Sequence, residues 1–214
     1  LFRSLRPGAK LLVFNGRDGE WQASLNESRK RTAVLGIEQQ TRPQEQGPDI
    51  DYLFAPLKRS RLDYMVQKAT EMGVRRLRPV ITERTIAERV NGERMLANAI
   101  EAAEQCGILR VPEVEPPVPL ETALAAWDPA RTLIYCDEHE TAADPIATLR
   151  KVPAGPVAVL IGPEGGFSNG ERSRLLANSY VVPLPLGPRI MRADTAAVAA
   201  LTLVNAVLGD WPRL

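Results

Sequence analysis

Residues 157–168 read VAVLIGPEGGFS, and residues 181–196 read VVPLPLGPRIMRADTA. In both stretches an extended apolar run leads directly into a glycine-bearing loop. Ser168 and Glu171 have the S-x-x-E spacing of a capping box, which predicts a helix directly after the first loop. The second loop leads into an apolar helix predicted to end near Gly209. Two strand ends that deliver loops followed by helices are typical of an open parallel sheet, in which ligands bind at the carboxyl edge.

Predicted strands and helices also alternate in the part of the chain that precedes these loops. Short apolar strands are expected at residues 52–55, 77–81 and 132–136, and helices are expected from Ser60 to Met72 and from Glu93 to Cys106. Shorter helices are expected at 120–127 and 145–150. Strands that alternate with helices predict an α/β domain built on a parallel sheet.

Particular residues make this prediction more specific. Ser60 is expected to cap its helix, with Asp63 at the third helical position. Pro79 cannot donate a backbone hydrogen bond, so its strand is expected to lie at a sheet edge or to end early. Helical spacing predicts that the helix starting at Glu93 buries Leu96, Ala99, Ala103 and Cys106. The last helix is apolar on nearly every side, which predicts burial in the core or in a subunit interface.

Residues 1–46 are expected to form a separate small β domain. A strand at 10–14, an Asn15-Gly16 turn and a return strand at 19–25 predict a hairpin, and residues 31–38 supply a third apolar run. This is too little chain for a large core, so we expect a small barrel-like domain or a fragment of one. The polar stretch 41–48 contains two prolines and a glycine and is interpreted as the linker to the domain at 47–214.

Composition excludes several classes of protein. Hydrophobic residues make up 44% and charged residues 25% of the 214 residues, as in globular domains. No apolar run approaches the roughly 20 residues that a membrane helix needs. Cys106 and Cys136 lack metal-ligand spacing and are expected to be buried small side chains in a reducing, cytoplasmic setting. The single histidine, His139, is expected on a surface loop, and we expect no metal site.

The two loops suggest different ligand chemistry. The first lacks both the G-K-[S/T] of a P-loop and the G-x-G-x-x-G spacing of a dinucleotide fingerprint. Glu164 in this loop would repel a pyrophosphate, so a neutral or cationic ligand close to the backbone is expected, unless the loop is only a tight turn. Arg189 and Arg192 in the second loop are of the kind that meets phosphates or carboxylates, although surface arginines look the same in a sequence.

Charge is unevenly distributed, although the formal net charge is only +1. Residues 58–94 carry ten basic residues against five acids, whereas residues 101–140 carry nine acids against two arginines. A basic half beside an acidic half is compatible with a phosphate-facing surface, and equally with two solvated helix faces.

The two loops together resemble those of a known family. LIGPEGGFS at 160–168 and LGPRIMRADTA at 186–196 are similar to the cofactor-binding motifs of the RsmE family, the small-subunit (16S) rRNA uridine-N3 methyltransferases of the SPOUT (trefoil-knot) superfamily. QKATEMGV at 67–74, IEAAEQC at 100–106 and RVPEV at 110–114 resemble internal motifs of that family. Residues 7–21 resemble its N-terminal PUA-like barrel, so the resemblance covers nearly the whole chain.

This resemblance implies the following architecture and ligands. An RNA-binding PUA-like β-barrel would occupy residues 1–46, and a SPOUT methyltransferase domain with a trefoil knot would occupy residues 47–214. The protein would be a homodimer that binds S-adenosylmethionine and small-subunit rRNA. The residues that fall on the family's cofactor loops are Leu160, Gly162, Gly165, Gly166, Leu186, Gly187, Ile190, Met191, Thr195 and Ala196.

Candidate residues can also be named for catalysis and for contact with RNA. Arg192 is our candidate for stabilising charge on the uracil when N3 loses its proton, and Glu164 is the candidate base or cofactor-orienting group. Basic side chains predicted to contact RNA are Arg3, Arg6, Lys58, Arg59, Arg61 and Arg189. Two alternatives stay open: a SPOUT methyltransferase acting on tRNA or another rRNA base, and an RNA-binding SPOUT protein without catalytic activity.

Overall fold

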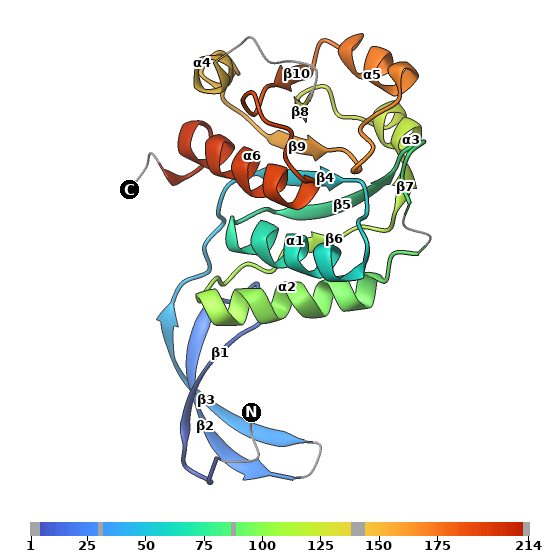
Figure 1. Ribbon diagram of the computed structural model, residues 1–214. Helices are drawn as coiled ribbons and strands as arrows, with labels where there is room; N and C mark the ends of the chain where they lie inside the picture. Colours follow the sequence, from blue (N-terminus) through green and yellow to red (C-terminus); the bar gives the residue numbers. More distant parts are fainter. Residues whose placement is uncertain (1–4, 30–31, 87–88, 138–143, 212–214) are drawn as a thin grey trace. The chain divides into compact units, whose positions relative to one another are not determined.

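The computed structural model describes residues 5–29, 32–86, 89–137 and 144–211 (Figure 1). The chain forms two compact units. One consists of residues 1–46 with 107–110, and the other of residues 47–106 with 111–214. His139, for which a surface loop was predicted, lies outside the described residues.

The first unit is built on a three-stranded antiparallel sheet in the order β1-β2-β3. Its strands are β1 (Lys10–Phe14), β2 (Glu20–Ser28) and β3 (Ala33–Arg42). The turn predicted at Asn15-Gly16 lies in the connection 15–19, where the side-chain oxygen of Asn15 accepts hydrogen bonds from the backbone N–H groups of Arg17 and Asp18. The linker predicted from Thr41 begins later, because the side chains of Thr41 and Arg42 bind Glu20 and extend β3.

The second unit contains a parallel sheet of seven strands in the order β10-β8-β9-β4-β5-β6, with β7 also paired to β5. The strands are β4 (Ile50–Phe54), β5 (Arg76–Ile81), β6 (Glu113–Val114), β7 (Val118–Pro119), β8 (Thr132–Cys136), β9 (Val157–Ile161) and β10 (Val181–Leu184). The helices are α1 (Arg59–Glu71), α2 (Gly92–Cys106), α3 (Leu120–Ala125), α4 (Pro145–Leu149), α5 (Asn169–Leu176) and α6 (Ala193–Val207). The predicted parallel α/β domain is therefore confirmed.

Both faces of this sheet are covered by helices (Figure 1), and the side chains along each strand point alternately to one face and the other. Ile50, Tyr52 and Phe54 of β4 pack in one cluster with α1, α2, α4 and α6. Leu53 of β4 and Leu160 of β9 pack in the other cluster, with α3 and α5. Because successive strand residues point to opposite faces, a strand covered on both sides must be apolar throughout. This explains why β9 is an unbroken apolar run.

Three details differ from the sequence prediction. Ser60 does not cap α1, because the helix begins at Arg59 and Lys58, two residues earlier, occupies the cap position without a side-chain hydrogen bond. Asp63 instead accepts hydrogen bonds from Arg94 and Asn98 of α2. In α2 the buried side chains are Met95, Ala99, Ala102 and Ala103, whereas Leu96 and Cys106 are exposed. The buried stripe is thus rotated by one residue from the predicted one.

Pro79 lies inside the sheet, and the prediction of an edge strand or an early end was wrong. Its strand β5 has β4 on one side and two short strands on the other. The strand β6 pairs with β5 at Arg76 and Leu77, and β7 pairs with it at Val80 and Ile81. Pro79 thus lies where the neighbouring strand is interrupted, so its missing N–H leaves no ladder hydrogen bond unmade.

Part of the basic stretch of the sequence forms an ion-pair cluster around Asp51, whose carboxylate is fully buried. Arg76 binds it through two nitrogens at 2.9 Å. Arg78 and Arg131 approach the same carboxylate at 3.4 and 3.5 Å. Arg78 also pairs with Glu115 and lies over the ring of Trp127. These arginines therefore neutralise an internal acid near the amino ends of the strands and are not free to face a phosphate.

Replacing Asp51 with Asn should destabilise the protein strongly, because three guanidinium groups would lose their shared counter-charge. We expect a loss of about 3 kcal/mol in the free energy of unfolding, measured by urea denaturation. Asp49→Asn is the matched control, since Asp49 pairs with Arg75 and Arg131 but its side chain is 41% exposed. Its loss should stay within about 1 kcal/mol. Equal losses in the two variants would contradict this account of the cluster.

Candidate functional site

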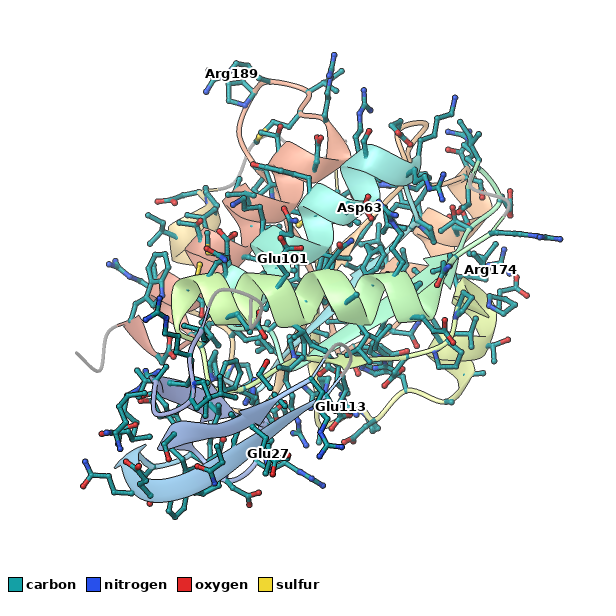
Figure 2. The ribbon with its side chains drawn as sticks, turned by 90° about the horizontal axis from the view of Figure 1, so that it is seen from below. Glu27, Asp63, Glu101, Glu113, Arg174 and Arg189 are labelled. Atoms are coloured by element: carbon teal, nitrogen blue, oxygen red, sulfur yellow. The ribbon has the colours of Figure 1, made fainter. Side chains whose placement is uncertain are left out.

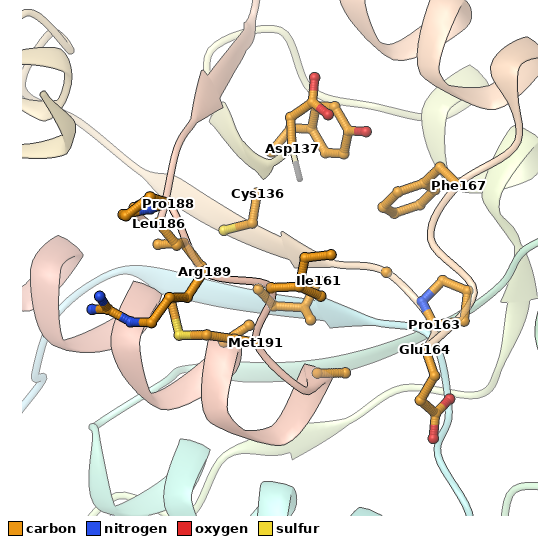
Figure 3. Close-up of a pocket in the computed structure, with 16 residues that line it drawn as sticks. Cys136, Asp137, Ile161, Pro163, Glu164, Phe167, Leu186, Pro188, Arg189 and Met191 are labelled. Atoms are coloured by element: carbon orange, nitrogen blue, oxygen red, sulfur yellow. The ribbon is translucent and has the colours of Figure 1, made fainter. Parts of the chain in front are cut away.

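The carboxyl ends of β8, β9 and β10 enclose a cleft of about 340 Å³ (Figure 3). In the sheet β8 lies between β9 and β10, so the loop after β9 borders the cleft on one side and the loop after β10 on the other. The lining consists of Tyr135, Cys136, Asp137, Ile161, Gly162, Pro163, Glu164, Phe167, Leu186, Gly187, Pro188, Arg189, Ile190, Met191, Ala193 and Ala196. The size is within the usual range for small-ligand sites.

The glycine loop, residues 162–168, is a tight turn in which Gly162 serves the protein's own packing. The N–H of Gly166 donates to the carbonyl of Pro163 at 2.9 Å, which closes the turn. A Cβ on Gly162 would lie 2.6 Å from Cε2 of Phe167. Phe167 is buried and meets Tyr135 edge-to-face, with ring centroids 5.2 Å apart. Glycine at 162 therefore leaves room for an aromatic ring that forms one wall of the cleft.

The predicted capping box is present where the glycine loop enters α5. The N–H of Glu171 donates to the Ser168 hydroxyl, and the N–H of Ser168 donates to one carboxylate oxygen of Glu171 at 2.9 Å. The other oxygen of Glu171 accepts a hydrogen bond from the backbone N–H of Glu83, also at 2.9 Å. Glu171 is buried, so its carboxylate is satisfied by two backbone donors from separate segments.

The loop after β10 supplies the other side of the cleft. Gly187 has φ +94°, a backbone conformation that glycine adopts without strain and other residues rarely do. Ile190 follows it with 95% of its surface exposed. Arg189 projects outward from this loop (Figures 2 and 3). Ala193 and Ala196 of the first turn of α6 line the cleft, so the N-terminus of this helix faces it.

The end of β8 contributes side chains that the sequence analysis did not include in the site. Asp137 follows β8 directly, and its buried carboxylate binds Arg172 of α5 at 2.8 Å. Cys136 faces the cleft between the two loops (Figure 3), and burial raises the pKa of its thiol to about 12. The prediction of a buried small side chain was thus wrong for the exposed Cys106 and only partly right for Cys136. An apolar strand that ends in Cys-Asp next to a glycine-loop strand was the available signal.

Only some of the predicted cofactor-binding residues line the cleft. Those that line the cleft are Gly162, Leu186, Gly187, Ile190, Met191 and Ala196, together with the candidate catalytic Glu164. Leu160 points into the core on the α3 and α5 face. Gly165 and Gly166 belong to the glycine loop but do not line the cleft, and Thr195 is exposed on α6. Arg192, the other candidate catalytic residue, is the exposed N-cap of α6 at the end of the second loop.

The predicted RNA-contacting residues divide into several groups. Arg61 of α1 pairs with Glu164 of the glycine loop at 3.3 Å, which brings the start of α1 next to the cleft. Lys58 and Arg59 are exposed beside it and form no salt bridge with any described residue. Arg6 is exposed in the first unit. Arg3 lies outside the described residues.

Among the described residues, no group of three or more His, Cys, Asp or Glu side chains is arranged to hold a metal ion. None of the described helices combines the length and apolar character needed to cross a membrane.

Gly162→Ala should be more destabilising than Gly165→Ala. The new Cβ at 162 must displace the Phe167 ring, whereas the nearest atoms to a Cβ at 165 lie 3.6 Å away, in ordinary contact. We expect Gly162→Ala to lose about 1–3 kcal/mol of unfolding free energy in urea denaturation. Gly165→Ala should change it by less than about 1 kcal/mol. The account of the glycine loop fails if the two variants are equally stable.

The two cysteines should differ sharply in alkylation by iodoacetamide. At pH 8 a thiol with a pKa of about 12 is ionised in roughly one molecule in 10⁴, and only the thiolate reacts. Peptide mass mapping should therefore find label on the exposed Cys106 long before it appears on Cys136. Urea-unfolded protein is the control and should be labelled at both positions. Similar rates in the folded protein would contradict the burial of the Cys136 thiol.

Comparison with known proteins shows which family this chain resembles. The sequence profile of the RNA methyltransferase domain matches residues 44–205. A ribosomal RNA small subunit methyltransferase E from Rickettsia conorii is 29% identical over 196 residues, covering 91% of this chain and 80% of the relative. The protein of the same name from Synechocystis sp. is 29% identical over 208 residues, covering 95% of this chain and 68% of the relative.

Solved structures show the same relationship. Ribosomal RNA small subunit methyltransferase E from Neisseria gonorrhoeae, bound to S-adenosyl methionine, matches with a TM-score of 0.84 at 28% identity, over 97% of this chain and 86% of that one. A Legionella pneumophila protein solved with bound SAM matches with a TM-score of 0.80 at 31% identity, over 96% and 86%. The chain therefore belongs to the RNA methyltransferase family, and within it to the RsmE type.

Proposed function

We propose that the protein transfers a methyl group from S-adenosylmethionine to N3 of a uridine in small-subunit (16S) rRNA. The observation that carries this proposal is the cleft at the carboxyl ends of β8, β9 and β10, bordered by both loops of an RsmE-type chain. The relative from N. gonorrhoeae was solved with this cofactor bound. The activity assigned to the relatives by name is small-subunit rRNA methylation.

The chemistry of the cleft fits S-adenosylmethionine. Ile161, Phe167 and Leu186 offer apolar surface suited to an adenine ring and a thioether-like chain. The carboxylate of Asp137 lies in the lining of the cleft, which suits a ligand with a cationic sulfur and an ammonium group. The N-terminus of α6, whose first turn lines the cleft, is suited to the ligand's carboxylate. This agrees with the neutral or cationic ligand expected from the sequence.

When bound, the cofactor supplies an already electrophilic methyl group, so the chain must position the acceptor and remove its proton. The N3 proton of uracil is only weakly acidic, and the charge left on the ring needs stabilisation. Arg192, exposed at the start of α6 beside the cleft, is our candidate for that electrostatic role. Cys136 is not a suitable base or nucleophile, because burial raises its pKa to about 12.

Of the two candidate roles for Glu164, we favour that of a cofactor-orienting group over that of a general base. Its carboxylate pairs with Arg61 at 3.3 Å, and its side chain points away from the centre of the cleft (Figure 3). To act as a base it would have to leave this ion pair and turn inward. As an orienting group it can remain where it is and keep the glycine loop attached to α1.

The proposed substrate requires side chains that bind RNA around the cleft. N3 lies on the pairing edge of uracil, so the target base must be unpaired or flipped out of its helix. Lys58, Arg59, Arg61 and Arg189 are proposed to bind phosphates near the cleft. The first two are exposed and form no salt bridge within the described part of the chain, and Arg189 projects outward (Figure 2). Arg3 and Arg6 are proposed to contribute from residues 1–46, as parts of a PUA-like RNA-binding domain.

We also propose a trefoil knot, a homodimer and a cytoplasmic location for this protein. A trefoil knot in residues 47–214 is supported by the strand order, since the chain passes from β8 to β9 and then returns across β8 to β10. A homodimer is supported by apolar residues of α6 that are only partly buried, namely Val198, Ala199 and Leu203. An rRNA substrate implies that the protein works in the cytoplasm.

The direct test is to incubate the full chain with methyl-labelled S-adenosylmethionine and small ribosomal subunits that lack the modification. Digestion of the rRNA and mass spectrometry of the nucleosides should place the label in 3-methyluridine at one site. Label in another nucleoside, or only in tRNA offered in parallel, would replace the proposed substrate. Cofactor binding without transfer to any RNA would favour a binding protein without catalytic activity.

Arg192→Met should lower kcat by about a hundredfold or more while cofactor affinity changes little, because the role assigned to Arg192 is in the transition state. Glu164→Gln should act mainly through KM for the cofactor, in keeping with an orienting role. A large loss of kcat in Glu164→Gln at saturating cofactor would instead restore Glu164 as the base.

A further inference from the structure

A short turn at residues 82–85, outside the lining of the cleft, is fixed by its own side chains. It follows β5 directly and reads Thr-Glu-Arg-Thr. The N–H of Thr82 donates to the Thr85 hydroxyl at 2.9 Å, and the N–H of Thr85 donates to the carbonyl of Thr82 at 3.1 Å. The two hydroxyls also lie 2.9 Å apart. The turn therefore presents Glu83 and Arg84 in one defined orientation.

Two contacts connect the 82–85 turn to the glycine loop. The buried carboxylate of Glu171 binds the backbone N–H of Glu83 with one oxygen and that of Ser168 with the other. Nη1 of Arg84 donates to the carbonyl of Gly165 at 2.7 Å. The Arg84 stem also packs along the loop, since its Cβ and Cδ lie 3.6 Å from the position of a Cβ on Gly165.

The contact with Arg84 determines the orientation of one peptide group in the loop. The carbonyl of Gly165 and the N–H of Gly166 belong to the same peptide. Arg84 binds the carbonyl, and Pro163 accepts from the N–H at 2.9 Å. Because both residues of this peptide are glycines, the intrinsic backbone preference is weak and the peptide would otherwise sample several orientations. The guanidinium selects one of them.

We propose that Arg84 is a positioning residue for the cofactor: it holds the glycine loop in its ligand-ready conformation before the ligand arrives. A loop ordered in advance lowers the conformational entropy that binding must overcome. The inference rests on the proposed function, because the ligand it concerns is S-adenosylmethionine. It adds that affinity for the cofactor depends on a side chain that does not line the cleft.

The test measures binding of S-adenosylhomocysteine, the unreactive product, to the full chain by isothermal titration calorimetry. Arg84→Met keeps the apolar stem and removes the hydrogen bond, and it should raise Kd about tenfold. Arg84→Lys retains a cation with a single donor and should recover part of this loss. Arg75→Met is the matched control: Arg75 is a partly exposed arginine that pairs with Asp49 at 3.2 Å, away from the glycine loop.

Thermal melting and kinetics separate positioning from general stability. Arg84 is exposed, so Arg84→Met should keep the melting temperature of the wild type while KM for the cofactor rises and kcat at saturating cofactor holds. Wild-type affinity in Arg84→Met would overturn the inference and leave the proposed function intact. Equal weakening by Arg75→Met, or a fall in kcat with unchanged Kd, would also overturn it. Failure of the wild-type chain to bind the product would instead count against the proposed function itself.

Discussion

One buried carboxylate organises the functional end of this molecule. Glu171 accepts one backbone N–H from Ser168, where the glycine loop becomes α5, and another from Glu83, in the turn after β5. Glu83 lies 88 residues before Glu171 in the sequence, and neither donor could be left unsatisfied in the interior without cost. The same side chain thus starts a helix, ends the glycine loop and attaches that loop to a neighbouring connection. The shape of the cleft follows from these constraints.

The two edges of the parallel sheet use charge in different ways. Near the amino ends of the strands, arginines converge on the buried Asp51 and so contribute to stability. At the carboxyl edge, Glu164 and Asp137 border the cleft and are paired with Arg61 and Arg172. The basic stretch of the sequence is therefore divided between structural ion pairs and the surroundings of the cleft. Sequence composition records only the total.

The cleft also depends on packing that is specific to this arrangement of strands. Because β8 lies between β9 and β10, the two loops are separated by one strand width, and Cys136 and Asp137 lie between them. Gly162 is small because the Phe167 ring occupies the space beside it, whereas Gly187 is needed for its backbone conformation. Similar glycines in two similar loops thus serve different purposes, one steric and one conformational.

The sequence by itself determined the alternation of strands and helices, the capping box at Ser168 and Glu171, and the two loops that border the cleft. These features are local: each follows from the periodicity of apolar residues or from side chains three residues apart. Only the tertiary structure decided that β8 separates the loops, that Pro79 fits where a neighbouring strand is interrupted, and that Arg84 reaches Gly165. It also placed Asp63, which was expected at the third position of a helix capped by Ser60, in a hydrogen bond with Arg94 of α2. Such contacts join residues far apart in the chain, and a single sequence carries no local pattern that identifies them.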